Sequence, residues 1–373
     1  MAQHVGIVGA GPAGLTLALL LHRAGIACTV LEARPREYVE QRVRAGLLEQ
    51  NTVDLLTELG VGERLAREGL DHTGVYLHFA GRSFHVDMLR LTGRKITIYG
   101  QQEVVKDEIA AVIERGIPIH FEAPVESVDP ERGTITWAGG TLECDLIAGC
   151  DGFHGVCRGA VPAGVIAEQE FTYPFSWLGI LAHAEPSTDE LIYAWHERGF
   201  ALHSMRGPEI SRLYLQVPND ARLEDYSDDA IWDELRVRLG SVNVGPIFDR
   251  GITPMRSFVC TPMQHERLFL AGDSAHIVPP TGAKGLNLAV NDVRLLADRL
   301  IGGDLESYSE TALRRVWRAQ DFSNYMTQLL HNLGGDDFQA GLQLARLDYL
   351  TRSEAAASSL AENYVGLPAT SDF

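Results

Sequence analysis

The segment His4-Val-Gly-Ile-Val-Gly-Ala-Gly-Pro-Ala-Gly14 is the strongest indicator of fold in this 373-residue chain. Its apolar first half predicts a buried strand, and the apolar run after it predicts a helix. Gly9, Gly11 and Gly14 have the GxGxxG spacing: the first permits a tight turn, the second lets backbone approach a pyrophosphate, and the third allows close helix–strand packing. Glu32 ends the next apolar strand, at the usual offset for an acid that hydrogen-bonds a ribose hydroxyl. This order predicts a dinucleotide-binding fold.

A second strand-turn-helix pattern lies near the middle of the carboxyl-terminal half. The apolar segment 267–272 ends at Gly272 and is followed by Asp273. This places the Asp273 carboxylate at the carboxyl end of a strand, where open α/β sheets bind ligands. A stiff Pro-Pro-Thr-Gly turn follows, and residues 287–301 predict a helix whose first N–H groups point back at the same crevice. The segment is suited to holding a flat ring by main-chain contacts.

A third marker is the apolar segment Cys144-Asp-Leu-Ile-Ala-Gly-Cys150, which ends in Asp151-Gly152. An amino-terminal dinucleotide fold followed by two such strand ends resembles the pattern of FAD-dependent hydroxylases. The likeness is closest to the p-hydroxybenzoate hydroxylase (4-hydroxybenzoate 3-monooxygenase) family of single-component aromatic hydroxylases, and it extends over nearly the whole chain. The other segments that carry it are residues 42–50, 99–103, 173–179, 198–202, 255–258 and 361–368.

The resemblance implies an α/β fold, α+β overall, built on a Rossmann-like FAD-binding domain of the glutathione-reductase type. The expected division is residues 1–72, 98–174 and 257–290 for the FAD-binding domain, 73–97 and 175–256 for an inserted β-sheet substrate domain, and 291–373 for a helical carboxyl-terminal or interface region. The pattern itself predicts a helical run over 48–70, a hairpin over 74–86, a β-rich stretch from 175 to 256 and a helical tail from Tyr308. Val316, Trp317, Phe322 and Met326 have helical spacing in that tail, which favours core packing and leaves a dimer interface open.

Composition limits the function classes. The formal charge of −18 argues against a nucleic-acid partner, and 45% hydrophobic residues allow two or three domains with sizeable cores. Five cysteines without CxxC spacing predict reduced thiols, a cytoplasmic location and no metal site. The apolar run 5–21 lacks a basic leader and contains a Gly-Pro turn, so neither a signal peptide nor a membrane span is expected.

Hydroxylation of a phenol needs a site that anchors a carboxylate at one end and removes a proton at the other. Strand alternation puts Ser204 and Arg206 on one face, and the planar guanidinium of arginine matches a carboxylate. By the resemblance, Tyr214 completes that anchor, and Pro280 and Thr281 contact the substrate, with the Pro280 carbonyl at the phenol oxygen.

Proton removal is assigned by the same resemblance to Tyr193, Tyr364 and His72. Together they form a hydrogen-bonded path from the phenol to the one side chain that titrates near neutrality, with His72 expected at the solvent side.

The resemblance also implies the cofactor residues. Arg42 and Arg44 are expected at the pyrophosphate, Gln102 and Asp273 at the ribityl–pyrophosphate region, and Arg212 over the flavin. Lys284, Gly285, Leu286 and Asn287 are expected to flank the flavin ring. The electron donor, NADPH or NADH, has no second GxGxxG, and His154, Arg256 and Arg34 match the family's donor groove. Ala33 replaces an arginine found after the acid in NADPH-specific relatives, which predicts relaxed or NADH-leaning donor use.

The leading interpretation is hydroxylation of 4-hydroxybenzoate to 3,4-dihydroxybenzoate with NAD(P)H and dioxygen, by a homodimer. Two alternatives remain open: a hydroxylase of a related ring such as 4-aminobenzoate, and a non-hydroxylating FAD-binding protein. A complete proton path has no use in the second alternative.

Overall fold

The computed structural model describes residues 4–44, 46–334 and 337–367. The outer ends of the expected domains, residues 1–3 and 368–373, lie outside the described residues, as does Ala45 in the segment 42–50. No helix in the described ranges is long and apolar enough to cross a membrane.

The nucleotide-binding part is a six-stranded sheet in the order β18-β19-β12-β1-β2-β8. Its strands are β1 (His4–Val8), β2 (Ala27–Leu31), β8 (Ile119–His120), β12 (Leu146–Gly149), β18 (Gln264–His265) and β19 (Leu268–Leu270). All pairs are parallel except β18 with β19. Helix α1 (Pro12–Arg23) packs against α6 (Gln101–Glu114) and α8 (Gly285–Gly302), so its leucines are buried on all sides. Each buried leucine contributes roughly 1.5–3 kcal/mol to folding.

Two three-stranded sheets flank this part. One has the order β11-β10-β9, and the other has the order β3-β7-β4. The bounds are β9 (Val125–Asp129), β10 (Thr134–Trp137), β11 (Gly140–Glu143), β3 (Leu47–Glu49), β4 (Leu70–His72) and β7 (Ile96–Ile98). Helix α2 (Arg36–Gln41) packs on α6.

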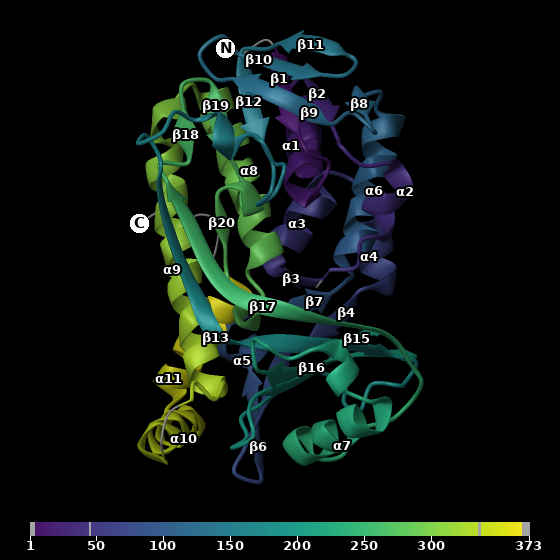
Figure 1. Cartoon of the computed structure of the whole chain (residues 1–373), viewed down its shortest axis with the longest axis vertical. Coiled ribbons are helices and arrows are strands. Elements are labelled where there is room, and N and C mark those ends of the chain that lie inside the picture. Colours follow the sequence, from purple (N-terminus) through teal and green to yellow (C-terminus); the bar gives the residue numbers. More distant parts are fainter. Residues whose placement is uncertain (1–3, 45, 335–336, 368–373) are drawn as a thin grey trace.

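The second large unit is an eight-stranded sheet in the order β20-β17-β13-β16-β15-β14-β5-β6. The bounds are β5 (Gly74–Phe79), β6 (Arg82–Asp87), β13 (Ala167–Ala182), β14 (Ile192–Ala194), β15 (Ala201–Gly207), β16 (Ile210–Val217), β17 (Ile247–Thr261) and β20 (His276–Ile277). Figure 1 shows β13 and β17 as long strands that run from the nucleotide-binding part into this sheet. The expected domain borders at 174–175 and 256–257 therefore fall inside two continuous strands.

Helices cover both faces of the eight-stranded sheet. Helix α7 (Asp228–Leu239) packs on one face through Ile231, Trp232 and Leu235. The opposite face packs on the carboxyl-terminal helices α9 (Tyr308–Leu330), α10 (Asp337–Arg352) and α11 (Glu354–Val365), with α5 (Met88–Thr92) beside α11. Figure 1 shows α9 running the length of the molecule, from the nucleotide-binding part to this face.

Three expectations need correction. The stretch 48–70 is not one helical run, because glycines at 60 and 62 separate α3 (Gln50–Glu58) from α4 (Glu63–Glu68), and its ends form β3 and β4. Gly60 has φ +72, a conformation that ends a helix. The β-rich stretch 175–256 also contains helix α7, capped by the Ser227 side chain. Trp317 does not pack in the core with its three neighbours: it is 47% exposed.

Candidate active site

The nucleotide turn has the close approaches that its glycines predict. A Cβ at Gly9, where φ is +104, would lie 2.4 Å from the Cys150 carbonyl oxygen, and a Cβ at Gly14 would lie 2.0 Å from the Gly9 carbonyl oxygen. Gly11 has nothing within 4 Å of that position, so its backbone is open to a ligand. Glu32 closes the turn: its Oε2 accepts from Ala10 N at 2.8 Å, and its other oxygen from the Arg34 amide.

A group of arginines lies between the nucleotide turn and the eight-stranded sheet. The Arg206 guanidinium donates to the Arg44 carbonyl oxygen and so joins β15 to the loop before β3. Desolvation lowers the pKa of Arg44, the charges of Arg42 and Arg212 lower it further, and Asp273 opposes them. Among the described residues, none of these four arginines has a carboxylate within salt-bridge distance. The group therefore carries excess positive charge.

Several polar atoms of the predicted site residues are buried without a hydrogen-bond partner among the described residues. They are Nε of Arg206, Nη1 of Arg212 and Oε1 of Gln102. Leaving a buried donor or acceptor unpaired costs about 1–3 kcal/mol, more for a charged group. Two unpaired guanidinium nitrogens in a cationic group fit anionic ligands, and the open backbone at Gly11 fits a pyrophosphate. The residues present therefore fit a flavin dinucleotide together with a substrate carboxylate.

The Gly-Asp turn after β19 lies at the carboxyl end of the nucleotide-binding sheet, as expected. Gly272 has φ +66 and its N–H donates to Asp292 Oδ2 at 2.9 Å. The same oxygen lies 2.6 Å from His276 Nε2 in a pair that is 2% exposed on both sides. This pair fixes the turn and leaves Asp273 exposed toward the arginine group.

The substrate residues of β15 and β16 lie in register. Leu202 is paired with Tyr214 and Ser204 with Arg212, so these four residues and Arg206 share one face of the sheet. The ring of Tyr214 lies over Gly179, where a Cβ would be 3.3 Å from it, and the Arg212 guanidinium lies 5.1 Å from the Tyr214 ring centre. The predicted carboxylate anchor is therefore one continuous polar patch.

The two tyrosines meet from opposite ends of the sequence. Tyr193 is on β14, in the row of Leu202, and Tyr364 is on α11. Their hydroxyl oxygens are 2.6 Å apart, and the side chains are 2% and 0% exposed. Burial raises the pKa of both phenols, so both are neutral at physiological pH. A neutral hydroxyl can accept one proton while it donates another.

His72 is at the end of β4, opposite Ile96 of β7. It is 1% exposed, and neither ring nitrogen has a hydrogen-bond partner among the described residues. The imidazole therefore does not reach the surface, contrary to the expected solvent-side position. Burial lowers the pKa of His72, and the charges of Glu190, Asp71 and Asp189 oppose that shift.

We expected the residues at the start of α8 to flank the flavin ring, but the side chains of Lys284 and Asn287 bind other parts of the protein. Lys284 Nζ lies 2.5 Å from Glu49 Oε1 in a buried ion pair and donates to the Tyr364 carbonyl oxygen at 2.9 Å. Asn287 Oδ1 accepts from the backbone of Glu49 and from Thr52, and its Nδ2 donates to two carbonyl oxygens. These side chains hold β3, α8 and α11 together, which leaves backbone groups of Gly285 and Leu286 for a ligand.

The Pro-Pro-Thr-Gly turn forms a short 3-10 helix over Pro280–Gly282. Pro280 is exposed, whereas Thr281 is buried and its hydroxyl accepts from Thr327 Oγ1 at 2.9 Å. Ala283 follows with φ 53, so the chain reverses sharply into α8. The Pro280 carbonyl oxygen accepts from Ala283 N at 2.9 Å, which leaves its second lone pair for a substrate.

The residues assigned to the electron donor separate into two places. Arg256 lies 3.9 Å from the ring centre of Phe153, and His154 meets the same ring edge-on at 5.0 Å. Arg34 lies instead over Tyr38, 5.5 Å from its ring centre, beside the arginine group.

Sequence reasoning missed several buried polar residues of this region. Asp292, His276 and Glu49 occupy helix or strand positions that no motif marks. His331 is a further case: its Nε2 accepts from Trp177 Nε1 at 2.7 Å, and the two rings stack behind Tyr214. Each pairing joins segments 16 to 235 positions apart, a relation that local pattern does not carry.

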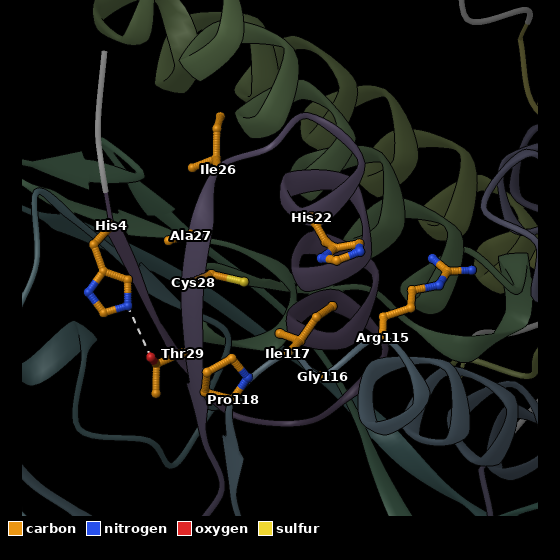
Figure 2. Close-up of a pocket in the computed structure, with 10 residues that line it drawn as sticks. All are labelled: His4, His22, Ile26, Ala27, Cys28, Thr29, Arg115, Gly116, Ile117 and Pro118. Atoms are coloured by element: carbon orange, nitrogen blue, oxygen red, sulfur yellow. Dashed lines mark hydrogen bonds between the residues drawn. The ribbon is translucent and has the colours of Figure 1, made fainter.

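A cavity of about 250 Å³ lies elsewhere, at the amino ends of β1 and β2 (Figure 2). His4, His22, Cys28 and Arg115 are among the residues that line it, and His4 Nε2 lies 3.0 Å from Thr29 Oγ1. It is at the edge of the sheet opposite the nucleotide turn, and none of the predicted site residues lines it.

The chain is similar to FAD-dependent monooxygenases over most of its length. The FAD binding domain family matches residues 2–323. The p-hydroxybenzoate hydroxylase of Acinetobacter baylyi is 46% identical over 388 aligned positions, which cover 99% of this chain and 96% of that protein. Kynurenine 3-monooxygenase of Salinispora tropica is 29% identical and covers 80% of this chain and 72% of its own length. The structure of p-nitrophenol 4-monooxygenase PnpA from Pseudomonas putida superposes with a TM-score of 0.83 at 17% identity, over 97% of this chain and 98% of that one.

The family match spans most of the chain, and the p-hydroxybenzoate hydroxylase match spans nearly all of it. FAD is the cofactor of this class, and NAD(P)H is its usual electron donor. With the nucleotide turn and the patch of Arg206 and Tyr214 both in place, the chain belongs to the family of FAD-dependent aromatic hydroxylases that includes p-hydroxybenzoate hydroxylase.

Proposed function

We propose that this protein hydroxylates 4-hydroxybenzoate to 3,4-dihydroxybenzoate, using FAD, dioxygen and NAD(P)H. The observation that carries the proposal is the buried contact of 2.6 Å between the hydroxyls of Tyr193 and Tyr364, on the sheet face that also holds Arg206. A carboxylate anchor and a proton acceptor on one face match the two ends of this substrate.

The nucleotide-binding part and the arginine group would hold FAD. Gly11 and Glu32 would take the pyrophosphate and adenosine ribose, and the unpaired Gln102 Oε1 and Asp273 would take the ribityl region. Arg42 and Arg44 would offset the pyrophosphate charge. When bound, FAD supplies electron transfer and oxygen activation.

Arg206 would bind the substrate carboxylate. Its unpaired Nε and the neighbouring hydroxyls of Ser204 and Tyr214 supply donors on one face, and a charge-assisted arginine–carboxylate pair is stronger than a neutral hydrogen bond. Arg212, paired with Ser204 across the strands, adds positive charge at the same place. The Pro280 carbonyl and Thr281 would bound the phenol end.

Tyr193 would accept the phenol proton while passing its own proton to Tyr364, and His72 would take it from there. Loss of this proton makes the ring a stronger nucleophile. Because burial raises the pKa of both tyrosines, neither retains a negative charge, and the pair transfers protons without storing charge. The buried pair also keeps bulk water from the phenol oxygen.

The electron donor NAD(P)H would bind near Phe153, whose ring contacts Arg256 and His154. Arg34 is exposed beside Tyr38, and Ala33 offers no charge for a ribose phosphate. We therefore favour NADH over NADPH.

The purified protein tests the proposal directly. Its visible spectrum reports bound FAD, and oxidation of NADH and NADPH is then followed with 4-hydroxybenzoate, 4-aminobenzoate, 3-hydroxybenzoate and benzoate, with product analysis. We expect 3,4-dihydroxybenzoate as the main product. Hydroxylation of 4-aminobenzoate but not 4-hydroxybenzoate would move the substrate to the related ring, and a flavoprotein that forms no hydroxylated product would exclude a hydroxylase.

We also propose a homodimer formed through α9 and α10. Phe338, Leu342 and Tyr349 on α10 are 69%, 37% and 61% exposed, and Trp317 on α9 is 47% exposed. Exposed aromatic groups of this size favour a protein contact. The solution mass should be that of two chains, and Phe338→Ser with Tyr349→Ser should halve it while FAD stays bound. A monomeric wild type would contradict this proposal.

The domain division given above stays a proposal, with its borders inside β13 and β17. A cytoplasmic location is proposed because all five cysteines are free and buried.

A further inference from the structure

We propose that Glu190 and His85 form the solvent end of the proton path, which carries the proton from His72 to the surface; this inference rests on the proposed function. Both lie outside the substrate patch, and neither touches Tyr193 or Tyr364.

The path needs such an exit because His72 is enclosed. The ring is 1% exposed, and its two nitrogens have no partner among the described residues. A base that takes protons from the tyrosines must also release them, and a buried imidazole cannot release them directly to solvent. A neighbouring group that titrates or hydrogen-bonds must take over.

Glu190 is fixed beside His72 by the backbone that follows it. Its Oε1 accepts from Thr73 N at 2.5 Å, Thr73 Oγ1 at 2.8 Å and Gly74 N at 3.0 Å. Three hydrogen bonds on one oxygen hold the carboxylate at the start of β5 and stabilise its charged form, so the pKa of Glu190 is lowered although burial opposes this. The charged carboxylate therefore lies next to His72.

His85 continues the path outward. Its Nε2 lies 2.5 Å from Glu190 Oε2, and its side chain is 32% exposed whereas that of Glu190 is 11% exposed. His85 is paired with Tyr76 across β5 and β6, and the two rings lie 4.8 Å apart. Tyr76 belongs to the face that packs on α7. The Glu190–His85 pair therefore extends from His72, around the edge of the sheet, to the face opposite the substrate patch.

The other charged groups around His72 are less suited to this role. Asp71 is held by Lys95 and by Thr97 Oγ1, so its charge is already compensated. Asp189 is exposed and also acts on His72 by charge. Burial lowers the pKa of His203 to about 4, so His203 is neutral and does not take the proton. Among these groups, only Glu190 is hydrogen-bonded to the segment after His72 and also to a partly exposed base, His85.

The proton count closes without any further reactant. The phenol loses one proton to Tyr193, Tyr364 passes one on, and His72 becomes cationic. His72 then returns to neutral as one proton reaches the Glu190–His85 pair, and His85 releases one to solvent. No electron moves in any of these steps.

The test follows ionisation of bound 4-hydroxybenzoate in the oxidised holoenzyme after a rapid pH rise, by the phenolate absorbance. Glu190→Gln keeps an oxygen for the Thr73 and Gly74 donors and removes the charge. His85→Gln removes the exposed base, and Asp189→Asn is the matched control that removes a neighbouring charge. FAD content and the Kd of 4-hydroxybenzoate are measured in each.

We expect ionisation to slow at least about fivefold in Glu190→Gln and in His85→Gln, with Kd and Asp189→Asn within about twofold of wild type. If Glu190→Gln loses FAD, the His85→Gln result alone tests the inference, because His85 is on the edge strand β6, away from the FAD-binding residues. Wild-type rates in both variants would overturn the inference and leave the proposed function intact. A wild type that binds the substrate but never ionises it would contradict the proposed function and this inference together.

Discussion

The two ends of the candidate substrate site differ in charge and burial. The anchor end has Arg206 and Arg212, each with one buried guanidinium nitrogen that lacks a hydrogen-bond partner and with no carboxylate in salt-bridge distance among the described residues. The proton end is a pair of neutral tyrosines, almost completely buried and hydrogen-bonded to each other. The anchor end carries positive charge without a partner, whereas the hydroxyls of the proton end are already hydrogen-bonded and can exchange a proton.

This difference indicates which end supplies affinity and which supplies reactivity. A fixed cation binds a carboxylate whether or not the phenol is ionised, so the anchor acts on substrate affinity. Neutral hydroxyls add little affinity but give the phenol proton a route out. Variants at the two ends should therefore separate binding from coupling.

The largest effect is expected at the anchor. Arg206→Ala removes the charge-assisted partner of the carboxylate, a loss of roughly 2–5 kcal/mol, so Kd for 4-hydroxybenzoate should rise at least about thirtyfold. FAD content should not change. Arg198→Ala is the matched control, because that arginine is 58% exposed and pairs with Glu234. Equal substrate affinity in Arg206→Ala and wild type would remove this residue from the anchor.

A smaller effect is expected for the choice of electron donor, which concerns neither end. With Ala33 after the acid, kcat/KM for NADH should equal or exceed that for NADPH at saturating 4-hydroxybenzoate. Ala33→Arg should shift the ratio toward NADPH. A wild-type preference for NADPH above about tenfold, or about 1.4 kcal/mol, would show that another residue such as Arg34 binds the phosphate.

The smallest effect on turnover is expected at Glu108, a buried titratable group outside both ends. It is 0% exposed, its Oε1 accepts from Thr16 Oγ1 at 2.5 Å, and burial raises its pKa from 4.5 to about 8. In the unfolded chain the carboxyl ionises above its ordinary pKa, but in the folded chain it stays protonated to about pH 8. The free energy of unfolding therefore falls as pH rises through this window.

Glu108→Gln removes that dependence. The Tm of the variant minus that of wild type should be more positive at pH 8 than at pH 5, by several degrees in thermal unfolding followed by circular dichroism. Product formed per donor oxidised should match wild type. A Tm difference that is the same at both pH values would show that Glu108 is ionised in the fold.

The nucleotide-binding part was predictable because its constraints are local. A Cβ at Gly9 or Gly14 would lie within 2.4 Å of a backbone atom, so only glycine fits there and the constraint is visible in the sequence. Ser204 and Arg206 were predictable from strand alternation. The tyrosine pair was not predictable from pattern, because Tyr193 and Tyr364 lie 171 positions apart, and only the family resemblance joined them.

The remaining features depend on tertiary contacts that no motif records. Lys284 and Asn287 have the expected positions, but their side chains are taken by Glu49, Thr52 and backbone carbonyls. The enclosure of His72 depends on how β4 packs against the eight-stranded sheet. Burial of a polar group is a property of the assembled core, and a short sequence window does not contain it.

We infer that the phenol proton leaves the site through the buried tyrosine pair. Tyr193→Phe keeps the ring and removes the hydroxyl, and the most direct measurement is 3,4-dihydroxybenzoate formed per donor oxidised. Tyr173→Phe is the matched control, since that hydroxyl is also on a buried tyrosine but donates to Asn324. We predict unchanged substrate Kd, a product ratio at least about tenfold lower with hydrogen peroxide in its place, and normal coupling in the control. Full coupling in Tyr193→Phe would contradict the claim.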